Sequence, residues 1–165
     1  MQLFRLDLSR LLSAAGVGAL LLLSAPAISA QPSAFSGLGG AWSGGGTVSL
    51  SDGSTERIRC RANYRVGGGG TTLKQSLRCA SDSYTFELNS DVVSQGESIS
   101  GTWSESSRNI NGSLLGRASG EFIAVFVEAA GFAANLTLTT HGSRQSVSII
   151  SQGEIKSVFL ALVRG

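Results

Sequence analysis

The stretch Thr55–Ala80, T-E-R-I-R-C-R-A-N-Y-R-V-G-G-G-G-T-T-L-K-Q-S-L-R-C-A, contains two runs of alternating apolar and polar residues on either side of four glycines. One face of the first run carries Ile58, Cys60, Ala62, Tyr64 and Val66, and the other face carries arginines. A period of two is typical of a half-buried strand. Glycine supplies the positive φ angles that a tight reversal requires. The stretch therefore predicts a β-hairpin that reverses at Gly67–Gly70.

The register of this hairpin follows from the position of its glycines. A reversal centred between Gly69 and Gly70 places Cys60 directly opposite Cys79. The Cβ atoms of directly opposed residues lie about 4.5–5.5 Å apart, and a disulfide needs about 3.5–4.5 Å. A small local adjustment would close that gap. The sequence thus predicts a disulfide between Cys60 and Cys79, with two buried free thiols as the alternative.

Residues 1–30 have the pattern of an export signal peptide. Arg5 and Arg10 make a positive start, Leu11–Leu23 is apolar, and small residues follow. The apolar run is too short for a membrane-spanning helix. Cleavage after Ala30 is preferred to cleavage after Ala27. We therefore expect an exported protein, periplasmic or extracellular, whose cysteines are normally oxidised.

The chain beyond the signal is long enough for one domain with a modest core. Removal of residues 1–30 from the 165 residues would leave 135. This part has eleven basic and ten acidic side chains, a balance that favours neither nucleic acid nor a membrane surface. Residues 31–39 are predicted to form a flexible lead-in. Residues 40–165 are predicted to form a single β-barrel domain.

From Gly40 onward, short alternating runs recur every ~10–12 residues, which is typical of a sandwich or a barrel. No helix is predicted after the signal, and proline is absent after Pro32, so ladder pairing can be continuous. Short turns predict an antiparallel up-and-down meander. Closing this all-β sheet into a barrel of about 8–10 strands would remove both edges. A two-sheet β-sandwich is the alternative.

Several side chains have a predicted place in this barrel. The interior is expected to hold Trp42, Tyr64, Phe86 and Trp103. A turn is expected at Val92–Glu97, before a strand at Ser98–Glu105. The strands 122–127 and 158–163 are apolar on both faces. Either a loop or the lead-in covers their outer side, or they form a homo-oligomer interface.

The residues that usually carry catalysis or bind metals are sparse. The only histidine, His141, lies in a predicted turn, and no G-x-S-x-G elbow is present. With both cysteines bonded to each other, no nitrogen and sulfur ligand set for a metal is left. Carboxylates near strand ends or on polar faces, expected to be solvated, are Glu56, Glu87, Glu105, Glu121 and Glu128. We therefore predict a protein that is not an enzyme and that has no cofactor.

Basic residues concentrate on the outer face of the predicted hairpin: Arg57, Arg59, Arg61, Arg65, Lys74 and Arg78. The predicted register places two pairs of like charges directly opposite each other, which is destabilising. These side chains would splay into solvent, or an anion would bridge them. One interpretation is a solvated face that protects against edge aggregation; the other is an anion-binding patch. No aromatic residues are interleaved, which disfavours nucleic acid.

The segment Gly40–Gly46, G-A-W-S-G-G-G, resembles the opening G-x-W strand of small exported barrels of the lipocalin and avidin type, the calycin-like proteins. This resemblance implies a closed barrel whose interior holds a small apolar ligand. The wider pattern W-S-G-G-G-T, R-C…R-C-A-S-D-S-Y and G-T-W-S-E-S-S also resembles uncharacterised exported proteins of bacteria. That second resemblance implies no function.

Three functions remain open from the sequence. The first is an exported, non-enzymatic β-barrel that binds a small ligand or an anionic surface or partner. The second is a small outer-membrane β-barrel. Against it, the strands run nearer eight residues than the roughly 9–11 that span a bilayer, and eleven aromatic residues leave few for two girdles. The third is a packed structural or interaction scaffold without a ligand.

Overall fold

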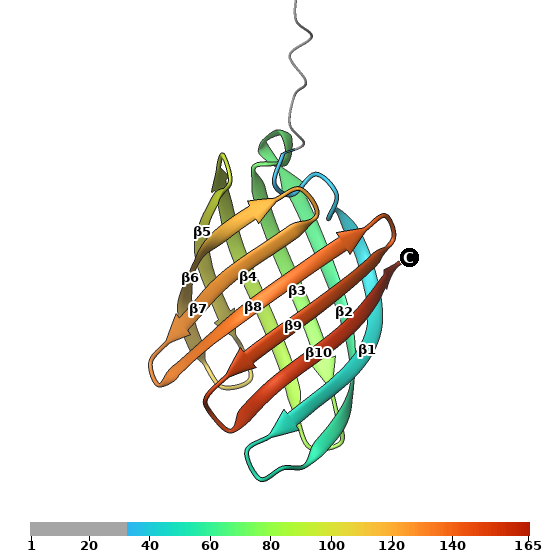
Figure 1. The fold of residues 1–165 in the computed structure, drawn as a ribbon, viewed down its shortest axis with the longest axis vertical. Coiled ribbons are helices and arrows are strands. Elements are labelled where there is room, and N and C mark those ends of the chain that lie inside the picture. The colour runs from blue at the N-terminus through green and yellow to red at the C-terminus, as the bar shows by residue number, and fades with distance from the viewer. Residues whose placement is uncertain (1–32) are drawn as a thin grey trace, which may run out of the picture. The chain divides into compact units, whose positions relative to one another are not determined.

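The structure, a computed structural model, describes residues 33–165 (Figure 1). The predicted signal peptide lies outside the described residues. The strands are β1 (Gly40–Leu50), β2 (Thr55–Gly67), β3 (Thr72–Ala80), β4 (Thr85–Gln95), β5 (Ser98–Glu105), β6 (Ile110–Ser119), β7 (Phe122–Ala129), β8 (Phe132–His141), β9 (Arg144–Ser151) and β10 (Ile155–Arg164). One 3-10 turn, η1 (Gly68–Gly70), joins β2 to β3. In this part of the chain no helix is both long and apolar enough to cross a membrane.

Every strand pairs with its neighbours in the sequence, and all pairs are antiparallel. The first and last strands, β1 and β10, also pair, which closes the sheet into a barrel. Closure satisfies the backbone groups that two free edges would leave unpaired. The predicted meander and the predicted barrel are both confirmed, with ten strands.

The β2–β3 hairpin has the predicted register. Cys60 lies opposite Cys79, and the two form a disulfide with an S–S distance of 2.06 Å. Both side chains are buried inside the barrel. The cross-link closes a loop of about 20 residues, which stabilises the fold by on the order of 3 kcal/mol in the chain-entropy model. The reversal itself uses three glycines with positive φ angles, those of η1.

Strand β4 is longer than predicted. A turn is expected from the sequence at Val92–Glu97, but β4 continues to Gln95 and Val92 is buried inside the barrel. The chain reverses instead around Gly96, whose φ angle is +62°. The alternation of apolar and polar residues is hidden in Leu88–Gln95, because serines as well as Val92 occupy inward positions. Pairing with both β3 and β5 holds the segment extended despite this weak pattern.

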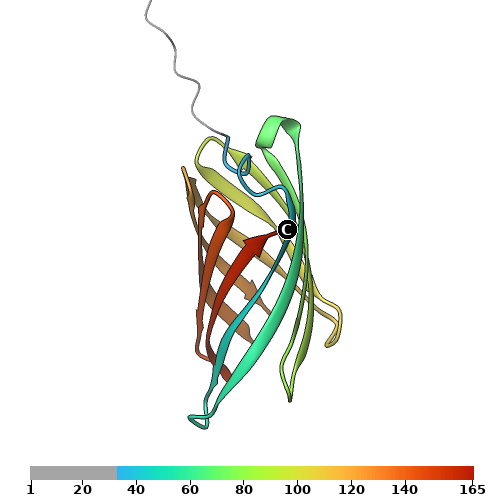
Figure 2. The same ribbon diagram turned by 90° about the vertical axis from the view of Figure 1, so that its right-hand side faces the viewer.

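The barrel is flattened into two layers (Figures 1 and 2). One layer contains β2–β4 and the other contains β7–β10, and β1 and β5–β6 join them at the corners. At the β1 corner the inward residues are Gly44 and Gly46. A Cβ atom at Gly44 would overlap the carbonyl oxygen of Ala161, and one at Gly46 would overlap that of Phe159. The W-S-G-G-G sequence is therefore explained by a bend that only glycine permits.

The segment 33–39 closes one end of the barrel. Phe35 and Leu38 are only 1% and 3% exposed. The Phe35 N–H donates to the carbonyl oxygen of Gly70 at 3.0 Å, and the Trp42 Nε1–H donates to that of Leu38 at 2.8 Å. For residues 33–39 this packing corrects the flexible lead-in expected at 31–39, because Phe35 and Leu38 fill the barrel end. We call this the closed end and the opposite one the open end.

The β1 corner gives a prediction for stability. Gly46→Ala should lower the free energy of unfolding by at least about 2 kcal/mol, because the added methyl group must push β1 away from β10. Thermal unfolding measures this change as a lower midpoint. Gly153→Ala is the matched control, since a Cβ atom there meets no atom within 4 Å. Equal midpoints for the two variants would contradict the proposed bend.

Candidate functional site

Inside the closed end, a buried polar bridge links the two layers. The Tyr64 hydroxyl on β2 donates to Gln145 Oε1 on β9 at 2.9 Å, and Gln145 Nε2 donates to Thr140 Oγ1 at 3.3 Å. All three side chains are buried. Burial raises the pKa of Tyr64 to about 12, although the hydrogen bond to Gln145 acts in the opposite direction. The sequence predicted Tyr64 inside the barrel, but it gave no signal for Gln145 or Thr140.

Toward the open end, apolar side chains of both layers point inward and yet remain partly exposed. We call this inner surface the open lumen; it comprises Leu77, Phe86, Leu88, Trp103, Leu136, Ile149 and Val158. Trp103 packs edge-on against Phe132, with ring centroids 5.8 Å apart, and its Nε1–H donates to the Ser113 carbonyl oxygen at 3.1 Å. Of the four predicted interior residues, the structure thus places two at the closed end, Trp42 and Tyr64, and two in the open lumen.

Loops at the open end form a mouth with one basic side chain beside aromatic rings. The Tyr84 hydroxyl donates to Glu154 Oε1 at 2.9 Å, which ties the β3–β4 and β9–β10 turns together. The rings of Tyr84 and Phe86 are stacked with centroids 6.1 Å apart. The Arg108 guanidinium carbon lies 4.9 Å from the Phe86 ring centroid. Arg108 also forms a long ion pair with Glu105, at 4.0 Å, so positive and negative charges lie together at these loops.

The position of Arg108 depends on a buried carboxylate, Glu105, which is 4% exposed. Glu105 accepts hydrogen bonds from the backbone N–H groups of Glu87, Ser107 and Arg108 at 2.8–3.1 Å. Burial opposes its ionisation, but these bonds outweigh that effect and hold the pKa of Glu105 below its ordinary value. The solvated carboxylate expected from the sequence is wrong here. Glu105 instead organises the β5–β6 turn that carries Arg108.

The basic outer face of the hairpin is partly neutralised by the next strand. Arg61 and Arg78 are directly opposite, as the register predicted. Arg78 forms an ion pair with Glu87 at 2.8 Å, and Lys74 forms one with Asp91 at 2.6 Å. Both carboxylates belong to β4 and lie opposite their partners in register. Carboxylates of the neighbouring strand thus compensate the like charges of the hairpin. Neither interpretation of the basic face from the sequence included such ion pairs.

The remaining basic residues of this face are Arg57, Arg59, Arg61 and Arg65, all exposed and outward-facing on β2. Among residues 33–165 the ion pairs include none of these four. Arg61 and Arg78 border an outer hollow of about 320 Å³, which we call the arginine hollow. Its other polar side chains are Ser43, Asn63 and Ser76. The structure therefore brings two of the six predicted anion-binding residues together in one concave place.

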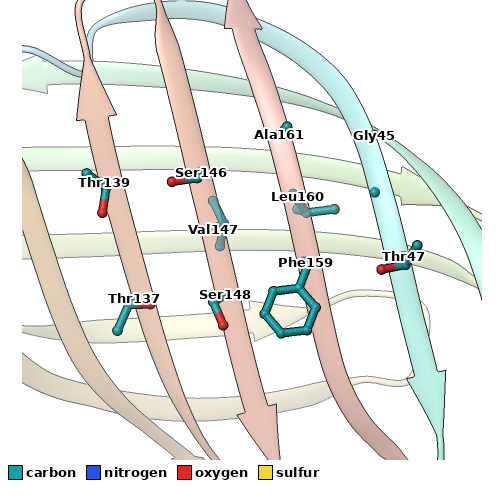
Figure 3. Close-up of a pocket in the computed structure, with 11 residues that line it drawn as sticks. Gly45, Thr47, Thr137, Thr139, Ser146, Val147, Ser148, Phe159, Leu160 and Ala161 are labelled. Carbon is teal, nitrogen blue, oxygen red and sulfur yellow. The ribbon is translucent and has the colours of Figure 1, made fainter.

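A larger hollow, of about 500 Å³, lies on the outer surface of β8, β9, β10 and β1. Figure 3 shows hydroxyl side chains of Thr137, Thr139, Ser146 and Ser148 on this surface, beside the Phe159 ring. The sequence gave no signal for this hollow, because its residues come from four separate strands.

The apolar strands β7 and β10 are exposed on their outer sides in the described structure. Phe122, Phe126 and Phe159 are 46%, 44% and 50% exposed. Neither a loop nor residues 33–39 cover them, since that segment packs at the barrel end. The expected cover by a loop or the lead-in is therefore wrong for residues 33–165. The homo-oligomer interface stays a prediction.

No protein-family model matches this chain, and no curated protein matches it. The crystal structure of Rv2717c from M. tuberculosis does match, with a TM-score of 0.64 over 79% of this chain and 94% of that chain. The two proteins share a fold. At 14% identity, the similarity concerns the fold alone. It agrees with the barrel that the G-x-W resemblance implied, while a relation to the lipocalin and avidin type stays a prediction.

The polar bridge predicts a separate titration for Tyr64. The ultraviolet absorbance of ionised tyrosine should rise in a late step near pH 12, and Tyr64→Phe should remove that step. Because the folded-state pKa exceeds the unfolded value of about 10, the folded state should lose stability as the pH rises from about 10 to 12. If Tyr64→Phe leaves the late step intact, Tyr64 is not buried as described.

Proposed function

We propose that this protein is an exported, non-enzymatic β-barrel that binds a small apolar ligand in the open lumen. The observation that carries the proposal is the partial exposure of inward-facing apolar side chains on both layers toward the open end. Covering such surface is favourable by about 25 cal/mol per Å². At the closed end, Phe35, Leu38 and the side chains of the polar bridge are buried and fill the interior.

The side chains around the open lumen suggest the chemistry of the ligand. Phe86 and Trp103 offer aromatic surface to an apolar body. The charge of Arg108 at the mouth is balanced by the carboxylate of Glu105, 4.0 Å away, and by that of Glu154 on the neighbouring turn. The charges around the open lumen therefore favour neither an acidic nor a basic group. We favour a small apolar molecule that is held by its apolar body.

The distribution of charge supports a barrel that works in water. Arg59, Arg61 and Lys74 point outward within their strands, and apolar side chains such as Ile58 and Leu73 fill the inside. An outer-membrane barrel has the reverse arrangement, and an arginine or lysine facing the bilayer midplane costs ~2–4 kcal/mol. The disulfide is consistent with export to an oxidising compartment.

The test is binding of anilinonaphthalene sulfonate, an apolar dye with one acidic group, to the detergent-free protein. Val158→Trp should fill the open lumen and weaken dye binding at least tenfold. Ser157→Trp is the matched control, because it adds the same ring to the outer face of the same strand. Native mass spectrometry of the exported protein should also show a small-molecule adduct that Val158→Trp loses. Equal dye binding by both variants would exclude the open lumen as the site.

A second candidate function is anion binding at the arginine hollow. It is favoured by the direct opposition of Arg61 and Arg78 beside the hydroxyl groups of Ser43 and Ser76. Arg78 is already paired with Glu87, which leaves Arg61 as the main cation for a bound anion.

Inorganic phosphate is the probe for the arginine hollow. In calorimetric titration, Arg61→Ser should weaken phosphate binding at least tenfold, whereas Arg65→Ser should leave it unchanged. Arg65 is the control because it lies on the same strand and face but does not border the hollow. Equal losses in both variants would indicate general charge attraction and would contradict a defined site.

A further inference from the structure

The outer face of β7–β10 and β1 has two central rows of residues without any charge. The pairing of the strands sets these rows. The lower row, nearer the open end, is Ala124, Thr137, Ser148, Phe159 and Thr47. The upper row is Phe122, Thr139, Ser146, Ala161 and Gly45. Together they form what we call the uncharged face, which includes the 500 Å³ hollow.

The two rows are complementary to each other in size and in chemistry. Consider a twofold axis that crosses the strands at the level of Leu160, between the rows. It lays the lower row of one molecule over the upper row of another, strand by strand. Phe159 then meets Ala161, and Ala124 meets Phe122, so a ring faces a methyl group in both cases. Between them threonine meets threonine and serine meets serine, where hydroxyl groups can hydrogen-bond to each other.

From this complementarity we propose that the uncharged face binds the same face of a second copy of this chain. Such a contact is isologous, so each favourable pair occurs twice. The Phe159 ring of one copy enters the hollow of the other, where Ala161, Gly45 and Ser146 leave room for it (Figure 3). Burial of Phe159 and Phe122, now about half exposed, supplies the apolar contact.

The size of the face limits the contact to a weak dimer. Five strands spaced about 4.8 Å apart, with two outward positions about 7 Å apart on each, cover roughly 300 Å² per copy. The total of about 600 Å² is smaller than a stable specific interface and is typical of weak, transient association. Antiparallel sheets also pack face to face with their strands nearly aligned, as this arrangement requires.

Charged residues begin where the uncharged face ends. Along the two rows, the next residues after Thr47 and Gly45 are Arg57 and Arg59 of β2. The bend of β1 at Gly44 and Gly46 turns β2 into the other layer (Figure 2). These arginines are therefore directed away from a second copy, and the repulsion between them does not arise. The same bend that shapes the barrel thus sets the boundary of the interface.

Sedimentation of the purified protein with size-changing variants tests the proposal. The wild type should dimerise weakly, at high protein concentration. Ala161→Phe should raise the dissociation constant at least tenfold, because two rings now meet at one place. Phe159→Ala should also weaken the dimer, because it leaves the hollow empty. The double variant Phe159→Ala/Ala161→Phe should restore dimerisation, because a ring again faces a methyl group.

The rescue distinguishes this arrangement from general stickiness. If apolar exposure alone caused association, Ala161→Phe would strengthen it, and that result would overturn the proposal. A monomeric wild type, or a double variant as weak as Ala161→Phe, would overturn it as well. Thr102→Phe, which adds a ring on the outside of β5, should leave the dissociation constant unchanged. Thermal midpoints show that each variant is folded, and the rescue cannot come from a misfolded chain.

Discussion

The close approach of β1 and β10 at two inward glycines is the constraint on which the rest of the structure depends. Because Gly44 and Gly46 carry no β-carbon, β1 bends against the carbonyl groups of Ala161 and Phe159. The bend flattens the closed sheet into two layers. It is this flattening that lets Tyr64 on one layer reach Gln145 on the other through a single hydrogen bond. A round barrel of ten strands would hold these groups farther apart.

The two layers differ in the chemistry of their outer sides. The layer of β2–β4 carries opposite charges in cross-strand register, as in the pairs Lys74–Asp91 and Arg78–Glu87. Exposed pairs of this kind contribute little stability, about 0–1 kcal/mol each, so they mainly relieve repulsion within the hairpin and keep that side hydrated. The layer of β7–β10 has hydroxyl groups and exposed rings in its central rows. One side is thus charged and hydrated, and the other is uncharged and partly apolar in its central rows.

The hairpin was predictable because its register is local: four glycines and the alternation around Cys60 and Cys79 suffice. Closure of the barrel was predictable because an open sheet would leave two unpaired edges. The flattening also gives the barrel two facing layers, as in the β-sandwich that was the alternative from the sequence. Gln145 could not be assigned, because its partner Tyr64 lies 81 residues away in the sequence. Glu105 could not be assigned either: Ser107 and Arg108 are close in the sequence, but its burial beside the Glu87 N–H depends on the pairing of β4 with β5. The uncharged face was equally hidden, since its rows become visible only once the register of five strands is known.

The open lumen and the uncharged face are two sides of the same strand. In β10, Val158 and Leu160 point inward while Phe159 and Ala161 point outward. A slip of β10 by one residue would exchange these sides, because side chains alternate across a strand. The glycines of β1 oppose such a slip. If β10 slipped by one residue, its carbonyl groups would lie against Ser43 or Thr47 instead of against the glycines alone. The β-carbon of either residue would not fit there. The bend that shapes the barrel therefore also keeps the apolar lining inside and the uncharged face outside.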